Sequence, residues 1–112
     1  MPASRNAPDG EKLETAKLKL VTIIAPYGLG DIVAKELRAL GVPGYTRTAA
    51  DGWGRHGVRH AGIVENANVR VELLLNAQLA EDVLRRVVDG FGDDAVVAFV
   101  RDVEAVPRNH FV

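Results

Sequence analysis

The sequence predicts a single α+β domain whose elements follow the order β-α-β-β-α-β. Its 112 residues are the size of one compact domain. Hydrophobic residues make up 47% of the chain and charged residues 26%, which is typical of a globular protein and not of a disordered one. Apolar runs of strand length alternate with two segments whose apolar residues recur at helical spacing, and glycine or proline separates them.

The first half of the chain is expected to form a strand, a helix and a second strand. Residues 19–25 are an apolar, β-branched run that ends at a proline-containing turn. Asp31 is placed to cap the helix, and Gly41 ends it. Residues 44–49 form the second strand. The apolar residues that recur at helical spacing between Asp31 and Gly41 are Ile32, Val33, Leu37 and Leu40.

The second half repeats this order. Residues 69–75 begin with alternating polarity and end fully apolar, which predicts a third strand. Asn76 is expected to cap a second helix, which residues 90–92 end. Residues 95–100 are the fourth strand, and a polar tail follows to the C-terminus. The core-facing stripe of the second helix is Leu79, Val83 and Val87.

Two such halves form a split βαβ, ferredoxin-like sandwich, in which both helices cover one face of a four-stranded antiparallel sheet. The opposite face of such a sheet is polar when it meets water. Here both faces are apolar, because Leu20 and Ile24 share the first strand with Val21 and Ile23. Another copy of the chain is the simplest cover for the second face, so we expect an oligomer.

The domain is predicted to span residues 18–112. Residues 1–17 carry two prolines, a glycine and scattered charges, with Leu13 as the large aliphatic side chain, so we expect a flexible lead-in. The net charge of −1 points to neither nucleic acid nor an anionic membrane as a partner. No apolar run is long enough to span a bilayer, and the start lacks the apolar centre of a secretory signal, so we expect a cytoplasmic protein without membrane insertion.

Three patterns that resemble known sites have simpler explanations. Gly28-Leu29-Gly30 follows a strand, as in a dinucleotide fingerprint, but Val33 replaces the third glycine and a plain turn is favoured. His56 and His60 are four residues apart, as in a metal-binding helix, but the glycines around them favour a loop without metal. Ser4 is the only serine and cysteine is absent, so the sequence shows no catalytic set.

The glycine-rich segment over residues 44–62 is the strongest candidate for binding an anion. It carries three arginines against Asp51 alone, a local charge of +2. Its run Gly52-Trp53-Gly54-Arg55 places backbone N–H groups beside a guanidinium, a combination that suits a phosphate. A hairpin loop with charges for solubility is the simpler alternative. A buried or half-buried Trp53, which we expect here, argues against this alternative.

These residues resemble the PII signal-transduction superfamily over residues 18–106. The most specific element is Gly52-Trp53-Gly54-Arg55, which matches the base of the T-loop between two strands. The sequence Ile24-Ala25-Pro26-Tyr27 resembles the end of the first strand of the family, and Val69-Arg70-Val71-Glu72 resembles the third. The resemblance therefore places the T-loop at about residues 51–68 and the C-terminal tail at residues 104–112.

The chain departs from the nitrogen-sensing members in ways that resemble the divergent PII-like proteins. Its T-loop is short and lacks their modified tyrosine, and Asn68 replaces a lysine. Residues 92–95, Gly-Asp-Asp-Ala, stand in place of the glycine-aspartate-glycine-lysine B-loop. The divergent PII-like proteins are linked to bicarbonate transport and carboxysomes, and they bind adenine nucleotides.

The resemblance implies a homotrimer with nucleotide sites in the clefts between subunits. The residues that it assigns to the phosphates are Gly52, Gly54, Arg55 and Arg59. Thr46 and Leu74 are assigned to the surroundings of the adenine. Arg108 matches the first arginine of the C-terminal loop, and His110 takes the place of the second. Glu72 matches a buried acidic residue of the family near the nucleotide, although a role as cross-strand partner of Arg70 explains an acidic residue at this position equally well.

The implied function is that of a non-enzymatic sensor of AMP, ADP or ATP, with bicarbonate as a second candidate ligand and no required metal. Ordering of the T-loop, which is expected to be mobile without ligand, would signal to a membrane transporter or a carboxysome-related protein. A copper-tolerance-type trimer of the same fold that binds divalent metal is the first alternative, and its support is limited to His56, His60 and His110. An enzyme on the same scaffold is the second alternative.

Overall fold

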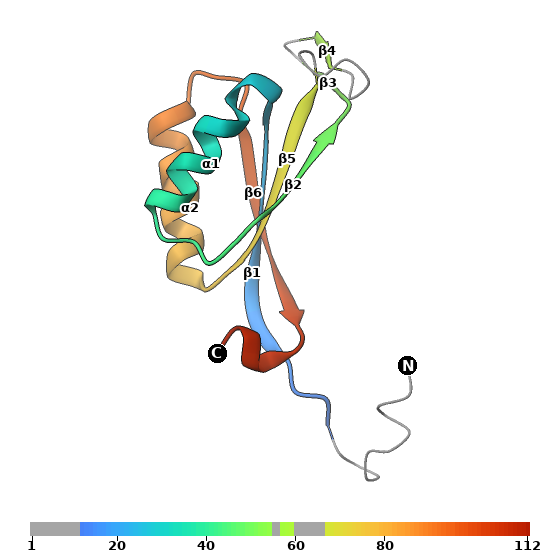
Figure 1. Cartoon of the computed structure of the whole chain (residues 1–112), viewed down its shortest axis with the longest axis vertical. Coiled ribbons are helices and arrows are strands. Elements are labelled where there is room, and N and C mark those ends of the chain that lie inside the picture. The colour runs from blue at the N-terminus through green and yellow to red at the C-terminus, as the bar shows by residue number, and fades with distance from the viewer. Residues whose placement is uncertain (1–11, 55–56, 60–66) are drawn as a thin grey trace.

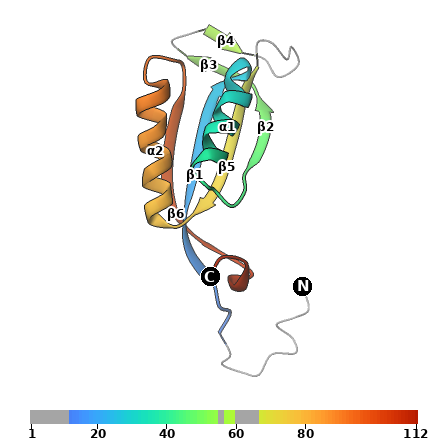
Figure 2. The same ribbon diagram turned by 60° about the vertical axis from the view of Figure 1, so that its left-hand side comes forward.

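The structure is a computed structural model that describes residues 12–54, 57–59 and 67–112. Four strands form an antiparallel sheet in the order β2-β5-β1-β6. Helices α1 and α2 both cover one face of it, as Figures 1 and 2 show from two sides. This arrangement confirms the predicted ferredoxin-like fold. In chain order, the elements of this layered unit are β1 (Ala16–Pro26), α1 (Gly30–Ala39), β2 (Thr46–Ala50), β5 (Asn68–Leu75), α2 (Ala77–Phe91) and β6 (Val97–Ala105).

Smaller elements lie at the two ends of the sheet. Strands β3 (Gly52–Gly54) and β4 (Gly57–Arg59) form a separate antiparallel ribbon in the part of the chain that connects β2 to β5. A 3-10 turn, η2 (Tyr27–Leu29), joins β1 to α1. A second turn, η4 (Arg108–His110), follows β6 at the opposite end of the sheet, near the bottom of Figure 1. The β3–β4 ribbon and the C-terminal turn therefore lie at opposite ends of the sheet.

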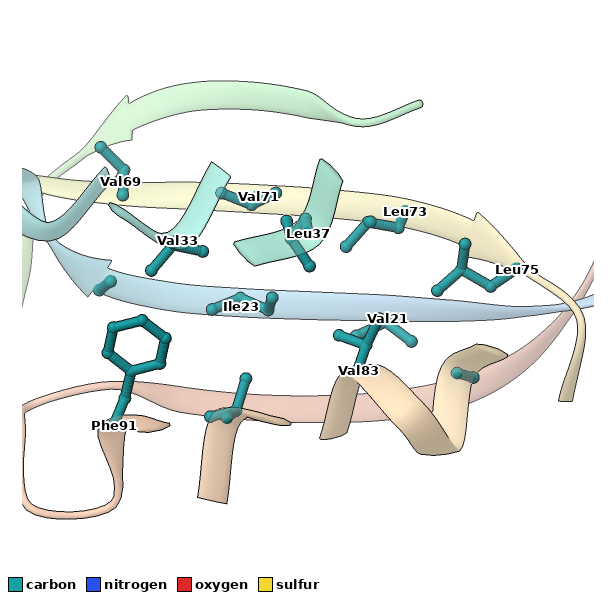
Figure 3. Close-up of a cluster of buried hydrophobic side chains, with 13 residues drawn as sticks. Val21, Ile23, Val33, Leu37, Val69, Val71, Leu73, Leu75, Val83 and Phe91 are labelled. Carbon is teal, nitrogen blue, oxygen red and sulfur yellow. The ribbon is translucent and has the colours of Figure 1, made fainter. Parts of the chain in front are cut away.

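The hydrophobic core lies between the sheet and the two helices. Alternate residues of β1 and β5 point into it, because successive side chains of a strand face opposite sides of the sheet. Val33 and Leu37 of α1 and Val83 and Phe91 of α2 pack on the same face of these strands (Figure 3). The fully buried strand residues at the centre include Val21, Ile23, Val71, Leu73 and Leu75.

Strands β1 and β6 are both longer than the sequence predicts. Strand β1 begins at Ala16 rather than at residue 19, and β6 runs from Val97 to Ala105 rather than over residues 95–100. The prediction of a polar tail from residue 101 onward is therefore wrong. The continuation of β6 pairs with the start of β1, where Leu18 lies opposite Val103 and Ala16 opposite Ala105. Alternating polarity suits an edge strand that is covered on one side only.

The two helix starts show one confirmed and one incorrect prediction. The Asn76 side chain accepts a hydrogen bond from the Leu79 backbone N–H at 2.8 Å, as expected of an N-cap. Asp31 does not cap α1, because the helix begins at Gly30, two residues earlier than an Asp31 cap implies, and Leu29 occupies the cap position. The Asp31 carboxylate instead accepts a hydrogen bond from Arg47 on β2 at 3.0 Å. Gly41 ends the helix as predicted, with a φ of +82° that favours glycine.

The sheet face opposite the helices divides into a polar half and an apolar half. One row across all four strands consists of Thr46, Glu72, Thr22 and Phe99. The β2 and β5 side of this face carries threonines and the pair Arg70–Glu72, with Leu74 near one end. The β1 and β6 side is mainly leucine, isoleucine, valine and phenylalanine, with Thr22 and Arg101 as polar exceptions. Val97 on this face is 59% exposed and Phe99 40% exposed. Among the described helices, none is long and apolar enough to cross a membrane.

Candidate functional site

A surface hollow of about 470 Å³ lies at the end of the sheet that carries the C-terminal tail. We call it the tail-end hollow. It brings together four residues that the sequence assigned to the nucleotide site: Thr46, Glu72, Leu74 and His110. Its other walls come from β1, from the turn before β2, from the start of α2 and from the tail, through Leu18, Pro43, Gly44, Tyr45, Leu75, Asn76, Leu79 and Phe111.

The polar groups of the tail-end hollow come from two paired strands. Thr46 of β2 lies directly opposite Glu72 of β5. Glu72 Oε2 also lies 3.4 Å from the Arg70 guanidinium. The two residues of this ion pair belong to one strand, so the expectation of a pairing across strands is wrong. Alternate residues of a strand share a face, and this explains the contact. A threonine hydroxyl and a carboxylate beside it can bind amino and ring-nitrogen groups at the edge of a base.

The apolar groups of the hollow can cover the flat faces of a base. Leu18 and Leu74 are half-buried on neighbouring strands, and Phe111 is half-buried in the tail. Among the described residues of the wall, His110 is the one whose side chain can carry a positive charge. Arg108 is not in the wall; its guanidinium lies 3.9 Å from Glu14. The described hollow thus offers surroundings for a base and few groups for a phosphate chain.

The base of the T-loop, which we define as residues 51–54, lies at the other end of the sheet. Gly52 pairs with Arg59 and Gly54 with Gly57 in the β3–β4 ribbon. A Cβ atom at Gly52 would collide with the side-chain amide of Asn68, so a larger residue there would displace Asn68. The Trp53 side chain is 83% exposed, and the expectation that it is buried or half-buried is wrong for the single chain. Arg55 lies outside the described residues, as does the side chain of Arg59.

One chain does not bring the predicted adenine residues together with the predicted phosphate residues. Gly52 is beside Asn68, the first residue of β5, whereas Leu74 is near its last. Leu74 follows Asn68 by six positions. At about 3.3 Å per position, these six steps span roughly 20 Å along the strand. Figure 1 shows the β3–β4 ribbon and the C-terminal turn at opposite ends of the sheet.

The described residues give no support to a metal site. They contain no group of three or more His, Asp or Glu side chains that could hold a metal ion together. His110 lies in the wall of the tail-end hollow, and His56 and His60 lie outside the described residues.

Sequence reasoning missed several wall residues of the tail-end hollow. Tyr45 directly precedes the predicted Thr46 in the chain. Strand pairing alone could have placed Leu18 near Leu74, because Leu20, two residues further along β1, pairs with Leu74. Phe111 could not be placed from its position in the sequence. It reaches the wall because η4 folds the tail back after β6.

Comparison with known proteins agrees with the resemblance of the sequence to the PII superfamily. The family model for nitrogen regulatory protein P-II matches residues 18–110 of the chain. A PII-like signalling protein from Thermus thermophilus is 32% identical in sequence; the match covers 88% of this chain and 99% of that protein, with a TM-score of 0.72. A comparison with curated proteins gives no match.

Two further solved structures share the fold at lower identity. CPII, a nitrogen regulatory PII-like protein from Thiomonas intermedia, was solved with ADP, AMP and bicarbonate bound. It is 22% identical, and the match covers 84% of this chain and 92% of CPII with a TM-score of 0.76. The GlnK–ATP complex of B. subtilis is 16% identical, with a TM-score of 0.54 over 78% of this chain and 82% of GlnK.

Proposed function

Since the chain belongs to the nitrogen regulatory protein P-II family, we propose that it is a non-enzymatic sensor that binds adenine nucleotides in clefts between the subunits of a homotrimer. AMP, ADP and ATP are the candidate nucleotides, and bicarbonate is a candidate second ligand. CPII, which has the same fold, binds ADP, AMP and bicarbonate. No metal is required by the residues that form the site.

The observation that carries this proposal is the separation of the two halves of the site within one chain. The tail-end hollow supplies surroundings for a base, and the T-loop base lies roughly 20 Å away along β5. A second copy of the chain closes this gap if its T-loop base meets the hollow of the first. The exposed apolar half of the open sheet face supports such an assembly, because Val97 and Phe99 are left without cover in one chain.

Within such a cleft, each half of the site has its own task. Thr46 and Glu72 bind the polar edge of the adenine, and Leu74 packs on its face. Gly52 and Gly54 of the neighbouring copy let its backbone approach the phosphates, and Arg55 and Arg59 supply charge-assisted hydrogen bonds to them. Arg108 and His110 in the tail add positive charge from the side of the hollow.

The signal leaves through the T-loop. Nucleotide binding orders the loop over residues 51–68, and the ordered loop is recognised by a partner protein. The partner that we propose acts in inorganic-carbon uptake or in the carboxysome, either as a membrane transporter or as a protein associated with it. Bicarbonate bound beside the nucleotide would couple this signal to carbon supply.

A complementation experiment tests the shared site directly. Thr46→Trp fills the tail-end hollow, and Arg55→Ala removes a phosphate contact, so each pure variant should bind AMP or ADP weakly in calorimetry. If the two variants are mixed, unfolded and refolded together, every mixed trimer regains one intact site, and about a quarter of all sites recover. No recovery, despite mixed trimers in native mass spectrometry, would place the site within one chain. A monomer in light scattering would contradict the proposal altogether.

A further inference from the structure

Thr22, in the middle of β1, is the one buried polar side chain among the described residues. It is 0% exposed, and its hydroxyl has no hydrogen-bond partner in the part of the chain that the structure describes. A buried hydroxyl without a partner lowers the stability of a protein, because it has given up its hydrogen bonds to water. Such groups are rare in folded proteins, so this one calls for an explanation.

Thr22 lies on the sheet face that carries three of the predicted nucleotide residues. It stands directly opposite Glu72 of β5 and opposite Phe99 of β6. Thr46 of β2 stands on the other side of Glu72. The Glu72 side chain is therefore flanked by a threonine on each neighbouring strand. Thr46 and Glu72 line the tail-end hollow, whereas Thr22 does not.

Glu72 is the acceptor that the strand register offers to the Thr22 hydroxyl. Residues directly opposite on antiparallel strands have Cβ atoms about 4.5–5.5 Å apart, and diagonal neighbours lie farther away. The diagonal neighbours on β5 and β6 are Arg70, Leu74, Val97 and Arg101. None of these four side chains can accept the hydroxyl proton. A second copy of the chain cannot supply an acceptor either, because the hydroxyl is closed off from the surface.

In the structure, the Glu72 carboxylate is turned toward Arg70 instead of Thr22. Its Oε2 atom lies 3.4 Å from the Arg70 guanidinium, which is long for a charge-assisted hydrogen bond. Both side chains of this pair are more than one-third exposed, so water weakens the attraction between them. Rotation about the side-chain bonds of Glu72 can therefore bring the carboxylate to the Thr22 hydroxyl at little cost.

We infer that Thr22 is a positioning residue for Glu72, through which the tail-end hollow recognises the amino group of adenine. The inference rests on the proposed function, in which Glu72 binds the polar edge of the base. When the base enters, the Thr22 hydroxyl donates a hydrogen bond to one oxygen of the Glu72 carboxylate. The other oxygen then accepts a hydrogen bond from the amino group of the base. The hydroxyl is satisfied only in the loaded protein, so its hydrogen bond contributes to binding and not to folding.

The main test is Thr22→Val, which keeps the shape of the side chain and removes the hydroxyl. The midpoint of thermal unfolding of the empty protein should rise by about 3–5 °C, because an unsatisfied buried hydroxyl is lost. In calorimetric titration of the full chain, AMP should bind about three- to tenfold more weakly, which is the contribution of one hydrogen bond.

The comparison ligand is purine riboside 5′-monophosphate, which is AMP without the amino group. Wild-type chain should bind it more weakly than AMP, because a site built to accept a hydrogen bond from an amino group discriminates against a ligand that lacks it. Thr22→Val should change its dissociation constant by less than about 1.5-fold, since the hydrogen bond that Thr22 supports is absent with this ligand. A purely structural role of Thr22 would change the affinity for both ligands by the same factor.

Two further variants serve as controls. Thr22→Ser retains the hydroxyl and should keep the preference for AMP, although the loss of a buried methyl group lowers stability. Thr48→Val changes an exposed threonine of β2 that lies opposite Arg70 and outside the wall of the hollow. It should leave both affinities and the unfolding midpoint unchanged.

The outcomes separate this inference from the function on which it rests. If Thr22→Val lowers the unfolding midpoint of the empty protein, the hydroxyl already has a partner there and the inference is wrong. It is also wrong if this variant keeps the AMP affinity, or if wild-type chain binds AMP and purine riboside 5′-monophosphate equally well. The proposed function stands in each of these cases, because AMP still binds to wild-type chain. If AMP, ADP and ATP all fail to bind to wild-type chain, the proposed function fails and the inference with it.

Discussion

The tail-end hollow and the T-loop base differ in what holds their residues in place. In the hollow, Thr46 and Glu72 are opposite partners within a four-stranded sheet, and the strand that carries Glu72 buries Leu73 in the core. At the T-loop base, two strands of three residues form a separate ribbon that carries an exposed Trp53. Two-stranded ribbons of this kind have little stability of their own. The tail-end hollow is therefore fixed by the folding of the sheet, whereas the T-loop base depends on its local backbone.

The largest expected effect separates the two regions by stability. Leu73→Ala removes a fully buried side chain beneath the hollow and should lower the free energy of unfolding by about 2–5 kcal/mol. Trp53→Ala removes an exposed side chain and should change it by less than about 0.5 kcal/mol. Urea unfolding followed by circular dichroism measures both. A large loss from Trp53→Ala would show that the T-loop base is packed in the assembled protein.

The next effect compares the two regions by ligand binding. A nucleotide at about 100 times its dissociation constant should stabilise each site by roughly 2.7 kcal/mol. Arg55→Ala should remove most of that gain, because charge-assisted phosphate contacts contribute about 1.5–3 kcal/mol. Thr46→Ala should remove less, about 0.5–1.5 kcal/mol for a neutral hydrogen bond. Thermal unfolding with and without AMP or ADP gives these shifts.

A matched control for this comparison is Arg85→Ala. Arg85 is an exposed arginine of α2 that pairs with Glu81, and its loss changes the net charge by the same amount as Arg55→Ala. It should leave the ligand-induced shift unchanged. Equal losses from Arg55→Ala and Arg85→Ala would reduce the role of Arg55 to a general charge effect.

A smaller effect distinguishes the two helix starts. Asn76→Ala removes an observed capping bond at the edge of the hollow and should cost about 1 kcal/mol of stability. Asp31→Ala removes an ion pair whose carboxylate is 95% exposed, so the cost should stay below about 1 kcal/mol and fall with added salt. Denaturant unfolding at two salt concentrations makes the comparison. A larger cost from Asp31→Ala would show that Asp31 supports the start of α1 more strongly than this contact indicates.

These two helix starts also show what the sequence could and could not predict. Apolar periodicity located both helices and all four main strands, because burial decides that pattern along the whole chain. The Asp31 cap was wrong because a glycine-containing 3-10 turn lets the helix start two residues earlier than predicted. Arg47 from a distant strand then donates a hydrogen bond to the Asp31 carboxylate. The extension of β6 was missed because its pairing with Ala16 and Leu18 is a long-range contact without a local signal.

The candidate site could be predicted only in part for a related reason. Thr46, Glu72 and Leu74 lie on strands whose register follows from the fold, and the structure places all three in one hollow. Arg108 lies outside that hollow, because the direction of the tail depends on η4 and on the contact with Glu14. The opposite positions of the T-loop base and the hollow follow from strand direction, which composition and motif spacing do not show.

The smallest expected effect concerns the T-loop end alone and has the opposite sign. Asp93→Asn with Asp94→Asn removes two negative charges beside the C-terminal end of α2, where the helix dipole disfavours them. The free energy of unfolding should therefore rise, by about 0.3–1 kcal/mol at low ionic strength. Asp82→Asn, in the middle of the same helix, provides the control and should give no such gain. Denaturant unfolding should show the gain at low salt and its loss at high salt, because screening acts on exposed charges. A decrease in stability would mean that the carboxylates stabilise the turn through local hydrogen bonds, and that the negative end of α2 is weaker than its composition predicts.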